Sequence, residues 1–128
     1  KHEHDGVIFH GFVPELDGLL GSTRLGLAPL RFGAGVKGKV NQYMAHGLPT
    51  IATSCAAEGM HLLDGEDVMI ASDADHFTDA AVTLYEDPDA WHTLSCNGLS
   101  NIEKYFSFES ARKAIVATFN DIRRNPQA

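Results

Sequence analysis

A glycine-rich stretch flanked by basic side chains is the part of this sequence best suited to chemistry. Residues 29–39 read Pro-Leu-Arg-Phe-Gly-Ala-Gly-Val-Lys-Gly-Lys, so that Arg31, Lys37 and Lys39 surround Gly33 and Gly35. Small residues let a backbone approach a ligand closely, and the free amides at the start of a helix attract phosphate. Basic residues are unfavourable in the first turn of a helix unless an anion docks there. We therefore predict an anion site at this loop; the alternative is a glycine loop that only turns the chain.

The charge distribution agrees with an anion site. The chain carries 10 basic and 17 acidic residues, for a net charge of −7. No acid occurs between residues 18 and 57, a window that holds the three basic residues of the loop and Arg24. Buried strands and glycine loops also exclude acids, which is the other explanation of this window. The overall negative charge argues against nucleic-acid binding driven by net charge.

Strand-like and helix-like patterns alternate through the first half of the chain. Apolar runs at residues 7–13, 25–30, 49–54 and 68–71 predict strands, and helices are expected at residues 15–23 and 36–46. This alternation predicts an α/β fold with a parallel sheet, in a single domain of residues 1–128. Ligands bind such sheets beyond the carboxyl ends of their strands, and the glycine loop lies directly after one of them.

The second half of the chain is predicted to be helical. Asp73 is a good cap for a helix that ends near Asp87, and a second helix runs to about Phe106. Ser107 caps a third helix. Its apolar positions, which we expect to face inward, are Ala111, Ala114, Ile115, Phe119 and Ile122. Tyr85 and Trp91 are predicted to belong to the core.

A dinucleotide-binding domain is one alternative. Gly33, Gly35 and Gly38 form a literal G-x-G-x-x-G, the pattern that cradles the pyrophosphate of NAD. Such a domain needs an acid for the ribose directly after the next strand, but Cys55 to Ala57 intervene before Glu58. A noncatalytic α/β interaction module is a further alternative, which would bind no nucleotide.

No metal site is predicted. Two Asp-x-Asp sequences begin at Asp73 and Asp87, where a helix cap and the end of a helix are expected. His2 and His4 lie near the chain end, where a solvated tail is expected. Cys55 is interpreted as a small buried residue, because no partner has the spacing that a nucleophile needs.

The cysteines and the hydropathy bear on location. Cys55 and Cys96 are too few for a disulfide scaffold and are interpreted as reduced thiols of a reducing compartment. No apolar run is long enough to span a membrane, and no signal peptide is visible.

Residues 28–40 and 43–53 together resemble the donor-binding half of GT-B glycosyltransferases, in particular the group 1 enzymes of glycosyltransferase family 4. Shorter stretches at residues 9–13, 58–60, 64–67 and 106–108 add to the resemblance, which covers nearly the whole chain. It implies a Rossmann-like, three-layer α/β/α domain. It also implies retaining transfer of a hexose-like sugar from a nucleoside diphosphate to a glycan or lipid-linked acceptor, with neither a metal ion nor another cofactor.

The resemblance also implies a role for each matching residue. The diphosphate would face Arg31, Gly33, Gly35, Lys37 and Lys39, whose charge offsets that of the leaving nucleoside diphosphate. The nucleoside would lie near Gly11, Phe12, Val13 and Gln42. The family usually carries two glutamates at the positions of Ala34 and Gln42. Gln42 can still bond a ribose hydroxyl, whereas the side chain of Ala34 cannot replace a carboxylate. Sugar contacts are therefore expected from the backbone, as at Ala34, or from the region of Arg31 or Glu58. No catalytic side chain is predicted.

Counted against the family, residues 7–13 are the third strand of the C-terminal domain. The first two strands and the N-terminal acceptor domain are therefore expected in a larger parent enzyme, and this chain alone is expected to be inactive. A sheet edge left without its neighbours favours pairing with a second copy, so a homo-oligomer is predicted. The family fits a cytoplasmic enzyme of surface-polysaccharide assembly, and a peripheral position at the inner membrane remains open.

Overall fold

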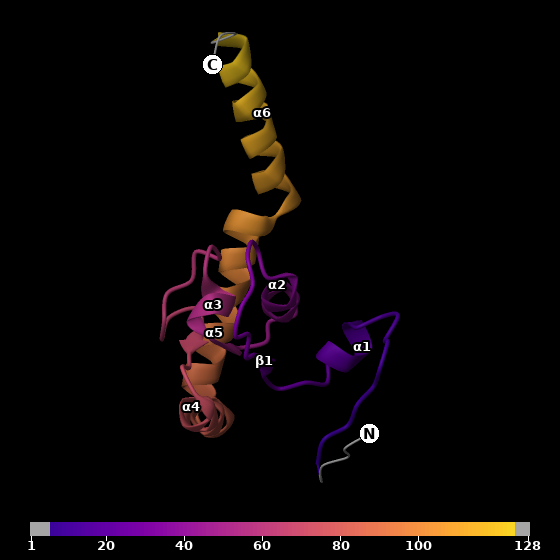
Figure 1. Ribbon diagram of the computed structural model, residues 1–128, viewed down its shortest axis with the longest axis vertical. Helices are drawn as coiled ribbons and strands as arrows, with labels where there is room; N and C mark the ends of the chain where they lie inside the picture. Colours follow the sequence, from indigo (N-terminus) through magenta and orange to yellow (C-terminus); the bar gives the residue numbers. More distant parts are fainter. Residues whose placement is uncertain (1–5, 125–128) are drawn as a thin grey trace.

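The computed structural model describes residues 6–124, so His2 and His4 lie outside the described residues. It shows a small α/β body, with one long helix projecting from one end and the N-terminal segment standing to one side (Figure 1). The elements in chain order are α1 (Asp17–Leu20), β1 (Gly26–Ala28), α2 (Gly38–Ala45), β2 (Thr50–Ala52), α3 (Ser54–Ala57), β3 (Met69–Ile70), α4 (Ala74–Glu86), α5 (Pro88–Asn101), the π-helix η1 (Ile102–Phe106) and α6 (Phe108–Arg124).

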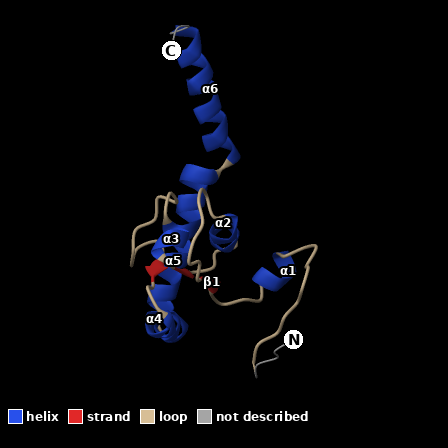
Figure 2. Cartoon of the chain, viewed as in Figure 1, coloured by secondary structure: helices blue, strands red, loops and turns tan. Residues whose placement is uncertain are grey.

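A parallel sheet forms the centre of the body. Its strands lie in the order β1-β2-β3, with Gly26 opposite Thr50 and Ala52 opposite Ile70. The strands are short, and helix dominates the chain (Figure 2). The α/β class and the parallel sheet are confirmed. The carboxyl ends of the three strands meet at one edge, where the glycine loop begins.

Helices cover both faces of the sheet. On one face, Ala28 and Ala52 pack with Val40 and Met44 of α2, and η1 adds apolar side chains to the same cluster. On the other face, Ile51 packs with residues of α4 and α5, namely Ala80, Leu84 and Leu94. The successive strand residues Ile51 and Ala52 thus point to opposite sides, as a pleated strand requires. This arrangement has the three α/β/α layers that were expected.

The predicted helix caps are confirmed. The Asp73 carboxylate accepts a hydrogen bond from the His76 amide at 2.9 Å. Asp87, predicted only as the end of a helix, also caps the start of α5, where it accepts from the amide of Asp89 at 2.9 Å. The Ser107 hydroxyl accepts from an amide in the first turn of α6. Both Asp-x-Asp sequences therefore begin with an aspartate that caps a helix.

The prediction of a strand at residues 7–13 is wrong. This segment forms no ladder with the sheet, and Phe12 is 90% exposed. It runs along the side of α1 that faces away from the sheet (Figure 1). Its β-prone residues favour an extended backbone, but a strand also needs an edge to pair with, and none lies beside it.

Two predictions of burial are also wrong. The stripe of Ala111, Ala114, Ile115, Phe119 and Ile122 on α6 is exposed, and no residue of this helix is buried. Periodicity makes the helix amphipathic, but no other described element lies against its apolar side (Figure 1). Tyr85, expected in the core, is exposed on α4, where the Arg24 guanidinium lies 5.0 Å from its ring centroid.

None of the helices between residues 6 and 124 combines the length and the apolar character needed to cross a membrane. Cys55 and Cys96 are free thiols.

Candidate functional site

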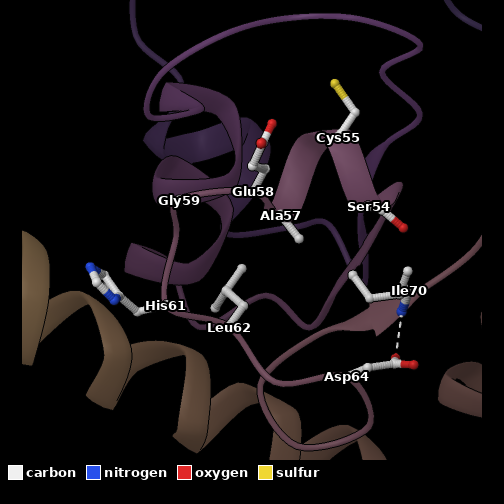
Figure 3. A pocket seen from close by; sticks show the side chains of 9 residues that line it. All are labelled: Ser54, Cys55, Ala57, Glu58, Gly59, His61, Leu62, Asp64 and Ile70. Carbon is white, nitrogen blue, oxygen red and sulfur yellow. Dashed lines mark hydrogen bonds between the residues drawn. The ribbon is translucent and has the colours of Figure 1, made fainter.

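A pocket of about 650 Å³ opens at the carboxyl edge of the sheet (Figure 3). It is formed by α3, by the loop that follows α3 and by β3. Its lining residues are Ser54, Cys55, Ala57, Glu58, Gly59, His61, Leu62, Asp64 and Ile70. Figure 3 shows the Glu58 carboxylate and the Cys55 thiol pointing in the same direction, toward the top of the view. The Cys55 thiol also lies 3.8 Å from the Gly33 carbonyl oxygen, so the glycine loop borders this pocket.

A hydrogen bond and a glycine backbone conformation shape the glycine loop. After β1, the Leu30 carbonyl accepts a hydrogen bond of 2.6 Å from the Thr53 hydroxyl, which also caps α3. In the middle of the loop, Gly35 has φ +70°, a backbone conformation that side chains with a Cβ rarely adopt. This glycine therefore has a structural reason to be there, independent of any ligand.

Lys37 is the unusual residue of this loop. Its side chain is buried, with 7% of the residue exposed. The ammonium donates one hydrogen bond of 2.6 Å, to the Gly35 carbonyl, although an ammonium has three protons to donate. Charged groups are rarely buried without full pairing. Lys37 thus places a cation with spare donors directly beside the backbone of the glycine loop.

The start of α2 adds further donors at the same place. No side chain caps this helix. Within residues 6–124, the amides of Gly38 and Lys39 have no backbone acceptor, while the Lys37 amide donates to the Met60 sulfur at 3.3 Å. Free first-turn amides carry the positive end of the helix dipole. Together with Lys37, they make this end of α2 suitable for an anion.

The structure brings most of the other predicted site residues to the same edge. Arg31, Ala34 and Lys39 are exposed on the loop and at the beginning of α2. Gln42 is exposed one turn further along α2, and Glu58 closes α3 at the pocket wall. Arg31 and Lys39 make no ion pair within the described part of the chain, so both remain available to a ligand.

Gly11, Phe12 and Val13 are not brought to the glycine loop. They belong to the N-terminal segment, which lies beyond α1 as seen from α2 (Figure 1). The ring of His46 at the end of α2 connects these parts, because it contacts the Asp17 carboxylate of α1 at 3.1 Å and the Gln42 carbonyl at 2.8 Å. The hydrogen bond to Gln42, followed by the bond to Asp17, raises the pKa of His46.

Three further residues support the site, and none of them was predicted as a site residue. Met60 is fully buried and accepts from the Lys37 amide. His61 is the one non-glycine residue with positive φ, at +56°, in the described part of the chain. Asn101 is buried and donates to the His61 carbonyl at 2.9 Å. Met60 belongs to the stretch 58–60 that resembles the family, but nothing in the sequence indicated that Met60, His61 and Asn101 act together, because only the fold brings them together.

Comparisons with known proteins agree with the fold. The family model described as "Glycosyl transferases group 1" matches residues 1–87. The crystal structure of the C-terminal domain of the glycosyl transferase group 1 family protein LpcC from Francisella tularensis superposes with a TM-score of 0.64 at 16% identity. The match covers 77% of this chain and 52% of that one, so this chain spans about half the length of the solved chain. No curated protein gives a significant match. The fold is that of a GT-B C-terminal Rossmann-like domain, and the chain belongs to the group 1 glycosyltransferase family.

Proposed function

We propose that this chain binds the nucleotide-sugar donor of a retaining glycosyltransferase, with the glycine loop holding the diphosphate. The single observation that carries the proposal is the ammonium of the buried residue Lys37, which has one hydrogen-bond partner and lies beside the uncapped start of α2. A diphosphate supplies the acceptors that these donors lack, and it supplies the negative charge that compensates the buried cation.

The basic side chains have a chemical role in this proposal beyond binding. When the glycosidic bond to the donor breaks, negative charge develops on the leaving nucleoside diphosphate. Donors fixed in advance around that charge stabilise the transition state more than they stabilise the bound donor. Lys37 is fixed by burial, while Arg31 and Lys39 reach the diphosphate from the exposed side of the loop. We propose that this counter-charge serves without a metal ion or another cofactor.

The pocket beside the loop is the proposed place of the sugar. Its volume of about 650 Å³ is within the range of small-molecule sites. Glu58 offers a carboxylate for hydroxyl groups of a hexose-like sugar, and the backbone at Ala34 offers polar groups from the loop. We propose Gln42 for the ribose. A contact between the nucleoside and Gly11, Phe12 and Val13 requires the N-terminal segment to move toward α2 from its place beyond α1.

The acceptor, a glycan or a lipid-linked sugar, would be bound by other parts of a larger enzyme that acts in the cytoplasm. This chain alone is proposed to bind donor and to transfer nothing. Transfer of sugar to an acceptor by this chain by itself would contradict that part of the proposal.

The test is an amide NMR titration of the chain with UDP, GDP, dTDP and NADH, each added separately. The proposal predicts shifts at residues 33–39 with one nucleoside diphosphate, which also identifies the base. Shifts with NADH alone would favour the dinucleotide-binding alternative. The absence of any response, repeated on a longer chain of the same enzyme, would favour an interaction module.

A further inference from the structure

We propose that Asn101, at the end of α5, is a positioning residue for the glycine loop. It would act through His61 and Met60 on Lys37, although Asn101 itself is not among the residues that line the pocket. An effect of Asn101 on donor binding rests on the proposed function. Its effect on the position of Lys37 can be tested without any ligand.

The first contact in this series joins α5 to the loop after α3. Asn101 is 6% exposed, and its amide group donates to the His61 carbonyl at 2.9 Å. His61 has φ +56°, which is an uncommon conformation for a residue with a side chain. A hydrogen bond from a buried amide to its carbonyl favours this conformation over the ordinary ones.

A second contact holds the same residue from its side chain. The π-helix η1 begins directly after Asn101 and widens the helical turn, as single-turn π segments do at many functional sites. It carries Tyr105, whose ring stacks on the His61 ring with the centroids 4.3 Å apart and the planes 16° from parallel. Backbone and side chain of His61 are thus both fixed by the same helical segment.

The next link runs from His61 to the start of α2. The neighbouring residue Met60 is fully buried, and its sulfur accepts the hydrogen bond of 3.3 Å from the Lys37 amide. The Lys37 ammonium in turn holds the Gly35 carbonyl. Because Met60 and His61 are adjacent in the chain, a shift of the His61 backbone displaces the sulfur that anchors Lys37, the residue directly before α2.

The amide of Asn101 is poorly explained by packing alone. Its side-chain oxygen is buried and has no hydrogen-bond partner among the described residues. A buried polar atom without a partner destabilises the fold, so a leucine or an alanine would serve packing better. The bond from its nitrogen to His61 is the one interaction that an apolar residue cannot replace.

The experiment compares Asn101→Ala with the matched control Asn97→Ala. Asn97 lies one turn earlier on α5 and makes the same kind of bond, from its amide nitrogen to the Glu66 carbonyl at 2.8 Å, and not to the residues next to Met60. Hydrogen exchange of the Lys37 amide and the NMR shift of the Met60 methyl group are measured without ligand. The core amides of Ile51 and Leu84 report global stability.

With Asn101→Ala, the Lys37 amide should exchange roughly fivefold faster relative to the core amides, and the Met60 methyl signal should move. With Asn97→Ala, both should stay as in the parent chain. Equal acceleration of all amides, or an unchanged Lys37 amide, would overturn the proposal. If Asn101→Ala does not fold, Tyr105→Leu decides in its place, because this exposed ring can be removed from the His61 stack without opening the core.

Titration with UDP, GDP and dTDP separates the two proposals. If the parent chain binds one of them, Asn101→Ala should weaken binding several-fold and Asn97→Ala should not. If the parent chain and a longer chain of the same enzyme both bind none, the proposed function fails. The exchange measurement still decides whether Asn101 positions Lys37.

Discussion

Replacing Lys37 by methionine tests the diphosphate site most directly. Methionine keeps the unbranched, apolar stem that lies buried beneath the loop and removes the ammonium alone. A hydrogen bond to a charged group contributes about 1.5–3 kcal/mol, so the dissociation constant of the nucleoside diphosphate should rise roughly 10- to 150-fold. The free energy of unfolding should change by less than about 1 kcal/mol, because losing the bond to Gly35 is offset by no longer burying a charge.

Isothermal titration calorimetry measures the binding of the nucleoside diphosphate that the NMR titration identifies. Urea unfolding measures the stability. Lys113→Met is the matched control, since it removes the same charge from the exposed surface of α6, where Lys113 lies 3.8 Å from Glu109. Lys37→Met should weaken binding strongly and Lys113→Met hardly at all. Equal weakening by both variants would show that net charge, and not the geometry of the loop, attracts the ligand.

Three further predictions concern the scaffold. Gly26→Ala should destabilise the fold by about 1–3 kcal/mol in urea unfolding, because its Cβ would lie 2.4 Å from a ring carbon of Tyr43; Gly38→Ala, which meets nothing within 4 Å, should not. The raised pKa of His46 means that its link to α1 is complete below its ordinary value of about 6.5 and is lost as pH rises through the folded value. Asp17→Asn should lower this pKa in an NMR titration, and an unchanged pKa would refute the link. Light scattering should detect a homo-oligomer through the free edge of β1, and a monodisperse monomer would contradict that expectation.

Features determined by neighbouring residues were predictable from the sequence. Asp73 and Ser107 cap helices because each side chain bonds an amide three residues along the chain, which is a local event. The glycine loop between β1 and α2 was predicted for the same reason, since a strand, small residues and a helix follow one another there. The α/β class followed from their alternation.

Features that depend on distant residues were not predictable. Residues 7–13 have the composition of a strand, but pairing depends on which edge lies nearby. The apolar stripe of α6 shows that the helix is amphipathic. It does not show whether another element packs against the apolar side. Within the site, the Lys37 amide bonds Met60, 23 residues away, and the His61 carbonyl bonds Asn101, which is 40 residues further along the chain.

The exposure of α6 has a consequence for the secondary structure of the chain in dilute solution. None of its 17 residues is buried, and its length is only slightly above the limit of about 12–15 residues below which isolated helices are marginal in water. Such a helix is stabilised by its own backbone bonds and by local pairs such as Arg112 with Glu109, at 2.8 Å. The helix–coil equilibrium of α6 is therefore independent of the cooperative unfolding of the α/β body. On warming, α6 should melt first and gradually, and a protease should cut it before it reaches any strand.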